Sequence, residues 1–282
     1  MNRDTIRQIA VWIAVIVTIV FNSIAGSSSA LNGQVTGDVA NRYLGENLWL
    51  PAGYVFAIWG LIYIGFIAYA IFQTLPAQKE NPRLRRIGWL FVLSCAANII
   101  WLIFFQYSSN PDPNGAPNTA LLIASMVTML VLLVTLIAIY LTLRAGAPRP
   151  GDTATAKWPV SRAERLSVWL LFSIYLGWIT VATVANASHV LVASGWTGQP
   201  LPALLWLIIM FAVALVLAAL MAFTQRDVAY LAVLVWAFVG IAVNYSDLTG
   251  VLISSIVAAL VVAVLAVLVA ARGAWRGKTY AA

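Results

Sequence analysis

One apolar stretch, Leu166–Val192, contains polar and aromatic side chains at helical spacing. They follow one another at steps of 3, 4, 4 and 3 residues: Tyr175, Trp178, Ala182, Asn186 and His189. Such steps place all five on one stripe of a helix. An unpaired amide is costly in hydrocarbon, so the stripe should face protein rather than lipid. From this stretch alone two interpretations stay open: contact between helices, or one wall of a binding pocket.

The available residue types restrict the chemistry of such a pocket. The chain has one histidine and one cysteine, too few for a metal site of the usual ligand count. The interiors of the apolar runs contain no Asp, Glu, Lys or Arg, which gives no support to a proton relay or an ion-coupled pump. No nucleophile is paired with a base and an orienting group. Uncharged amides and flat indole faces suit a flat, mostly apolar ligand with a few polar edges.

The elements that must position these residues are membrane helices. With 62% hydrophobic and 9% charged residues, the chain is far less charged than a soluble domain. The sequence predicts an all-α integral membrane protein with eight spans, each long enough to cross a bilayer core. The runs are Ile6–Ala25, Tyr54–Leu75, Ile87–Tyr107, Thr119–Leu143, Leu166–Val192, Pro202–Phe223, Val228–Tyr245 and Gly250–Ala271.

The charge between the runs alternates along the chain. Both ends, the loop around Lys79–Arg86 and the loop Arg144–Arg165 are basic, whereas the intervening loops carry few positive residues. The positive-inside rule therefore places both termini in the cytoplasm, with residues 26–50 outside. A distribution of this kind is a topology signal and argues against a nucleic-acid surface. The first run also resembles a signal peptide, but its length favours an uncleaved helix.

Three helices bring aromatic and amide groups to one depth in this topology. The second span contributes Phe56, Trp59 and Tyr63, and the third contributes Asn98, Trp101 and Phe105, each set on one face. The fifth span contributes the stripe described above. All lie beneath the long loop Gly26–Leu50, from which Trp49 could close the site. We therefore predict a cavity in the outer half of the membrane.

These residues resemble the TspO/MBR family, the tryptophan-rich sensory proteins related to the mitochondrial translocator protein. The second-helix pattern of the family is matched by Pro51, Val55, Phe56, Trp59 and Tyr63. Its third-helix pattern is matched by Asn98, Trp101, Phe104 and Phe105, and its fifth-helix pattern by Tyr175, Leu176, Trp178, Ala182 and Asn186. The resemblance covers residues 1–193 of this chain.

The resemblance implies a TspO-like five-helix unit, residues 1–195, followed by a three-helix extension, residues 196–282. It also implies binding of porphyrins, sterol-like lipids or synthetic aromatic ligands, with Trp59 and Asn98 hydrogen-bonding the ligand and Trp178 and Ala182 lining the wall. Asn186 lacks the Tyr and basic residue that the family's cholesterol pattern requires after it, which argues against sterol. No cofactor is required, although a porphyrin or haem-like ligand is expected.

Three functions compete at this point. The leading one is a membrane receptor or carrier of a porphyrin-like ligand with a sensory or regulatory role, in a bacterial plasma membrane. A secondary transporter is favoured by eight spans and by a partial repeat between Leu176–Ser188 and Leu234–Ser246, whose Trp236, Gly240 and Asn244 stripe should face protein. A porphyrin-degrading enzyme is suggested by the family alone. The expected partners are membrane lipid and a hydrophobic small molecule, with a homodimer as the assembly and no nucleic acid.

Overall fold

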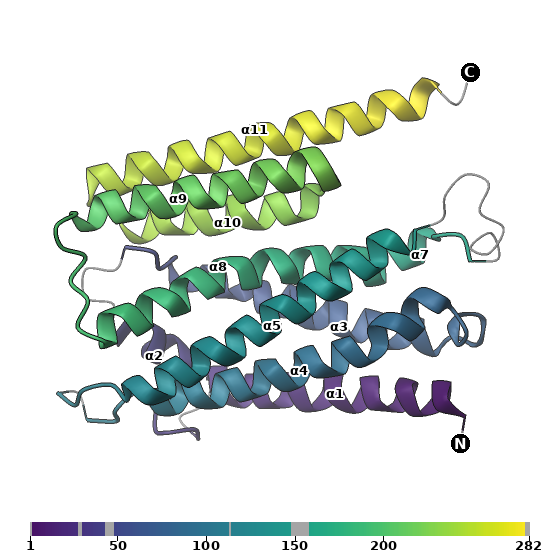
Figure 1. The fold of residues 1–282 in the computed structure, drawn as a ribbon, viewed down its shortest axis with the longest axis horizontal. Helices are drawn as coiled ribbons and strands as arrows, with labels where there is room; N and C mark the ends of the chain where they lie inside the picture. The colour runs from purple at the N-terminus through teal and green to yellow at the C-terminus, as the bar shows by residue number, and fades with distance from the viewer. Residues whose placement is uncertain (1, 28–29, 43–47, 113, 148–157, 280–282) are drawn as a thin grey trace. The chain divides into compact units, whose positions relative to one another are not determined.

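The computed structural model describes residues 2–27, 30–42, 48–112, 114–147 and 158–279, and this part of the chain contains helices and no strand (Figure 1). The longer helices are α1 (Arg3–Ser27), α3 (Ile58–Thr74), α4 (Pro82–Ser108), α5 (Thr119–Ala145), α8 (Leu170–Ala193), α9 (Ala203–Leu220), α10 (Val228–Asn244) and α11 (Thr249–Thr279). The short ones are α2 (Thr36–Arg42), α7 (Arg162–Glu164), 3-10 turns at Gly53–Ala57 and Pro76–Gln78, and π-helical turns at Arg165–Trp169 and Met221–Gln225.

The longer helices correspond to the eight predicted spans within five residues at each end, except that α11 continues eight residues beyond Ala271. Seven of them, counted over the described residues, are long and apolar enough to cross a membrane. The eighth, α10, has 17 residues and is apolar throughout. A helix of that length rises about 26 Å, slightly less than the roughly 30 Å of a bilayer core. The prediction of an all-α membrane protein is confirmed.

The chain forms two compact units. The first unit consists of Met1–Arg42 and Ile58–Ile179, and the second of Tyr43–Ala57 and Thr180–Ala282. The division therefore falls inside α8, whereas the sequence predicts domains at 1–195 and 196–282. That pair of domains stays a prediction, which truncation can test.

In the first unit α4 begins at a side-chain cap and meets α3 in an aromatic core. The side chain of Asn81 accepts a hydrogen bond from the Arg83 amide at the start of α4. Pro82 occupies the first turn, where a backbone amide would have no partner within the helix, so the proline costs no hydrogen bond. Within the core Phe66 contacts Phe91 edge to face, with ring centroids 5.1 Å apart. Such contacts fix the α3 and α4 faces that carry the residues of interest.

The helices extend beyond the apolar runs, and they bury charged residues at one end of the first unit. Arg83 on α4 makes two hydrogen bonds of 2.7 and 2.8 Å to the Glu164 carboxylate on α7, and both side chains are almost fully buried. Arg7 on α1 is also buried and donates to the Lys79 carbonyl at 2.9 Å. Arg83 and Glu164 lie outside the predicted runs, and Arg7 is the second residue of the first run, so the prediction of charge-free run interiors is unchanged.

In the second unit residues 48–57 pack on α10. The Ala52 amide donates to the Gly240 carbonyl, the Trp236 indole donates to the Val55 carbonyl, and the Asn244 amide donates to the Leu50 carbonyl, each at 3.0 Å. Gly240 permits this approach, because a Cβ there would lie 2.2 Å from a methyl group of Val55. All three residues of the stripe contact residues 48–57, but Trp236 and Asn244 are still exposed, so the orientation of the whole stripe stays a prediction.

Candidate functional site

An aromatic cluster centred on Trp59 joins α3 and α8 in the first unit. Its indole stacks on Tyr63, with centroids 5.8 Å apart and the rings inclined by 25°. It also contacts Tyr175 and Trp178 edge to face, at 6.1 and 6.3 Å. Tyr175 and Trp178 are buried, whereas Trp59 and Tyr63 are half-buried. Four of the predicted site residues thus form one cluster, in which the α8 members are buried and the α3 members are more accessible.

The polar member of this cluster is Asn98 on α4, which is completely buried. Its Oδ1 accepts a hydrogen bond of 2.9 Å from Nδ2 of Asn22 on α1, which fixes the orientation of the amide. Its own Nδ2 makes no hydrogen bond. The Tyr175 hydroxyl interacts with Asn98, yet it makes no hydrogen bond of normal geometry either. Two buried polar groups therefore lie together with at most a weak interaction between them, which is less favourable than full hydrogen bonding.

Trp101 and Phe105 lie one and two turns further along α4. Their rings stack with centroids 5.4 Å apart and an inclination of 19°, and both residues are buried. Just beyond them, Gln106 anchors the chain that follows α1: its amide donates to the carbonyls of Leu31 and Gln34. Asn32 donates in turn to the Gln106 carbonyl at 2.9 Å. The described first part of the predicted loop Gly26–Leu50 is therefore held at this end of α4.

The four other predicted site residues belong to the second unit. Trp49 is buried against Phe211 and Phe238, with centroids 5.3 and 5.9 Å away, and its indole donates to the Val181 carbonyl at 3.3 Å. Asn186 is buried, and Ala182 and Phe56 are half-buried. His189, the remaining stripe residue, bonds through Nδ1 to the Ala185 carbonyl of its own helix at 2.8 Å. Among the described residues no three His, Cys, Asp or Glu side chains gather as a metal site would require.

A comparison with protein-family models decides the family. The model described as TSPO-like protein matches residues 8–271. The chain belongs to the TSPO-like protein family. No curated protein and no solved structure shows a significant match to it.

The span of the TSPO-like match reaches beyond the resemblance seen in the sequence. It includes α9, α10 and most of α11, so the last three helices belong to the pattern of this family. Membership supports, in general terms, an integral membrane protein with a ligand-binding or sensory role.

Asn22 is the site residue that sequence reasoning missed in this TSPO-like chain. It lies inside the apolar run of α1, where an amide is unusual, and that exception was the available signal. Its side chain also donates to the Thr18 carbonyl one turn earlier, at 2.9 Å. Asn22 thus connects α1 to Asn98, and a helix that carried no predicted site residue takes part in the polar centre.

Proposed function

We propose that this TSPO-like protein is a membrane receptor or carrier for a planar, mostly apolar ligand of the porphyrin type, with a sensory or regulatory role. The observation that carries the proposal is the pair of buried, unsatisfied polar groups at Asn98 and Tyr175 beside the Trp59 cluster. A ligand that brings an acceptor to Nδ2 of Asn98 would remove a penalty that the free protein bears.

The surroundings of these polar groups favour an aromatic ligand. Trp59, Tyr63 and Trp178 supply ring faces and edges, and their contacts with one another show the spacing at which a further ring would pack. Asn22 and Tyr175, which interact with Asn98, are uncharged, so binding rests on stacking and neutral hydrogen bonds. A flat macrocycle with a few polar substituents fits this chemistry better than a small ion or a sugar.

Differences in burial indicate the route of entry. Asn98 and Tyr175 are fully buried, whereas Trp59 and Tyr63 are half-buried and stack on each other. We infer that a ligand enters by separating or displacing this stack. Rotation of half-buried aromatic side chains opens a pocket without moving a helix.

The position of the basic residues supports a site in the outer half of the membrane. Trp59 lies at the start of α3, and Lys79 follows the far end of that helix. The ion pairs of Arg83 and Arg85 lie at the start of α4, well before Asn98. The positive-inside rule places the basic end in the cytoplasm, and the Trp59 cluster then lies in the outer half of the membrane.

Quenching of tryptophan fluorescence by protoporphyrin tests the proposal. The full chain in lipid nanodiscs should show saturable quenching, and Asn98→Leu should weaken the affinity about threefold to tenfold, the value of one hydrogen bond. Trp178→Phe should remove part of the quenching. Trp169→Phe, nine residues earlier in the chain, is the matched control. It should leave both the porphyrin affinity and the fluorescence lost at saturation unchanged.

Two outcomes would overturn the assignment. Saturable quenching that is identical in wild type, Asn98→Leu and Trp178→Phe would place the ligand elsewhere. Quenching that never saturates would reflect partitioning of porphyrin into lipid. Exchange of labelled porphyrin across proteoliposome membranes would then distinguish a carrier from a receptor that only binds.

A further inference from the structure

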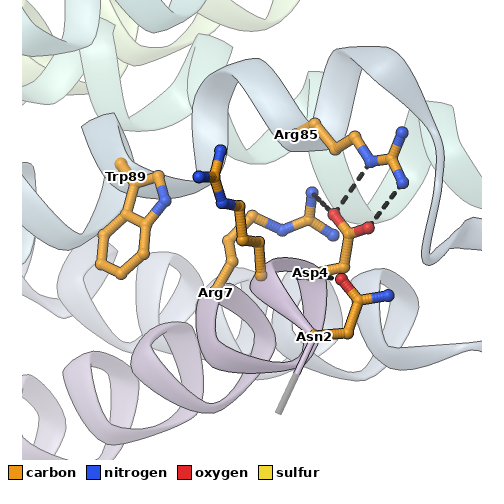
Figure 2. A pocket seen from close by; sticks show the side chains of 6 residues that line it. Asn2, Asp4, Arg7, Arg85 and Trp89 are labelled. Atoms are coloured by element: carbon orange, nitrogen blue, oxygen red, sulfur yellow. Dashed lines mark hydrogen bonds and ion pairs between the residues drawn. The ribbon is translucent and has the colours of Figure 1, made fainter.

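A separate cavity lies at the basic end of the first unit, between the starts of α1 and α4 (Figure 2). Its volume is about 380 Å³, and it is lined by Asn2, Arg3, Asp4, Arg7, Arg85 and Trp89. Asp4 stands between two of the arginines: Arg85 donates to both of its carboxylate oxygens, at 2.8 and 2.5 Å, and Nη1 of Arg7 lies 3.3 Å from Oδ1 (Figure 2). Three guanidinium groups and one carboxylate leave the lining with a formal charge of +2.

Arg7 distinguishes this cavity from an ordinary cluster of cytoplasmic arginines. The residue is only 2% exposed, its Nε makes no hydrogen bond, and its Nη1 has only the 3.3 Å ion pair with Asp4. Nη2 alone donates, to the Lys79 carbonyl. Arginines that act only as topology signals stand in solvent, where water satisfies every donor. A buried guanidinium with unsatisfied donors in the wall of a cavity requires an acceptor, and an anion is the strongest one.

Gly88 on α4 makes room for this arrangement. A Cβ at position 88 would lie 2.6 Å from Cδ and 2.8 Å from Cγ of Arg7, so the Arg7 side chain packs directly on the helix backbone. The guanidinium is thereby held in the cavity wall rather than released into solvent. Holding a charged group in place before a ligand arrives lowers the entropy lost on binding.

We propose that this cavity binds a phosphate group at the cytoplasmic membrane surface, supplied by an anionic phospholipid or by a soluble phosphate ester. Arginine is suited to phosphate because its planar donors match the phosphate oxygens, and Arg3 and Arg7 are the groups available for it. Asp4 already neutralises Arg85 through two hydrogen bonds and keeps that side chain in place at the rim.

The surface next to the cavity favours the lipid as the source. Trp89 lines the cavity and is 53% exposed, and an exposed apolar stripe continues from it along α4 through Leu93, Ala96 and Ile100. These residues follow at steps of 4, 3 and 4, on one face of the helix. A headgroup in the cavity would therefore have its acyl chain along this stripe, with Trp89 at the interface, where indoles are enriched.

Brominated lipids test the proposal, because bromine quenches a nearby indole. The full chain is reconstituted in dioleoylphosphatidylcholine containing increasing brominated phosphatidylglycerol or brominated phosphatidylcholine. The signal of Trp89 is the difference between wild type and Trp89→Phe. We expect phosphatidylglycerol to quench Trp89 at about tenfold lower mole fraction than phosphatidylcholine, as one charge-assisted contact would allow. Soluble glycerol phosphate, added to the same samples, separates the two sources: it should lower the preference for phosphatidylglycerol if the cavity takes soluble esters, and leave it unchanged if the lipid is the ligand.

Charge variants show whether the cavity is responsible. Arg7→Gln should reduce the preference for phosphatidylglycerol to about twofold or less, and Arg3→Gln should reduce it about threefold. Arg86→Gln is the matched control: it removes the same charge from the next position of α4, where the side chain is exposed and outside the cavity, and it should change nothing. Arg3 is exposed, so its variant remains informative even if Arg7→Gln does not fold.

Three results would overturn the proposal. One is equal quenching by the two lipids, with no effect of glycerol phosphate. Another is an equal loss of preference in Arg3→Gln and Arg86→Gln, which would indicate general surface charge. The third is a preference that persists in full in both Arg7→Gln and Arg3→Gln, which would place the lipid away from this cavity.

Discussion

At the scale of single residues, Asn98 and Tyr175 carry an energetic cost in the unliganded protein. Their polar groups are buried among rings, and only the Asn98 oxygen is satisfied, by Asn22. Proteins retain such destabilising groups mainly where the groups serve a function. A binding role and a purely structural role therefore make opposite predictions for the removal of these groups.

Tyr175→Phe should separate stability from binding. Removing a buried hydroxyl that makes no hydrogen bond should raise the free energy of unfolding by about 1 kcal/mol, while porphyrin affinity falls. Tyr69→Phe is the control, because the Tyr69 hydroxyl is equally buried and equally without a hydrogen bond. The Tyr69→Phe variant should be more stable than wild type, with no change in its affinity for porphyrin. Thermal unfolding in detergent and the fluorescence titration measure the two effects, and a parallel response of both variants would contradict the assigned site.

A second prediction at this scale concerns Gly240. Gly240→Ala adds a methyl group within 2.2 Å of Val55 and 3.0 Å of Pro51, so it should lower stability by about 1–3 kcal/mol through overpacking. Gly60→Ala is the matched helix glycine with open space around it, and it should be neutral or stabilise by up to about 1 kcal/mol. The difference between their unfolding temperatures is the measurement. Equal values would mean that residues 48–57 are not packed on α10.

At the scale of elements, the buried pair of Arg83 and Glu164 ties α4 to α7. Arg83→Met should lower stability by about 3–5 kcal/mol, because it leaves the Glu164 carboxylate buried without its partner. The double variant Arg83→Met, Glu164→Leu should recover most of that loss. Chemical unfolding of the single and double variants measures the coupling. Additive losses in the double variant would show that the two side chains act independently.

The helices themselves could be predicted from the sequence, and the contacts at their ends could not. A run of apolar residues long enough to span a bilayer determines a helix almost by itself, so α4 and α5 were placed within a few residues. Arg83 and Glu164 are 81 residues apart, and their pairing depends on how two helix ends approach each other. Charged residues beside an apolar run are interpreted as loop residues by hydropathy alone. The cavity around Arg7 was missed for the same reason.

The candidate site was predictable in part. Helical spacing and family resemblance selected Trp59, Tyr63, Tyr175 and Trp178, which contact one another in the structure. Trp49 was expected to close the site from a loop, and its role there stays a prediction, since the structure shows it packed with Phe211 and Phe238 in the second unit. Packing between side chains distant in sequence, such as these, leaves no periodic signal.

At the scale of the whole molecule, the orientation in the membrane is testable by labelling. In a Cys95→Ala background, a cysteine at exposed Asn114 should react with an impermeant maleimide added outside intact cells, and one at exposed Arg162 should react only after permeabilisation. A cysteine at Asn2 should behave like the one at Arg162. Reaction of all three from outside would invalidate the topology with both ends in the cytoplasm.

Truncation tests the predicted division at residue 195. A chain that ends at Gly195 lacks the helices to which residues 48–57 hydrogen-bond, and it removes Phe211 and Phe238 from Trp49. We expect it to unfold at a lower temperature and to bind porphyrin more weakly than the full chain. Equal stability and affinity would mean that residues 1–195 are the complete binding domain and that the last three helices have another role.

The packing of residues 48–57 on α10 also sets an order of events during synthesis. Val55 bonds to Trp236, 181 residues later, and Leu50 bonds to Asn244, 194 residues later. At roughly 5–20 residues per second, about 10–40 s pass between translation of the two partners. For most of that interval the early segment has left the ribosome while α10 does not yet exist. Its apolar residues must then be shielded by lipid or by the insertion machinery, and slowing translation before α9 should prolong its exposure to proteases.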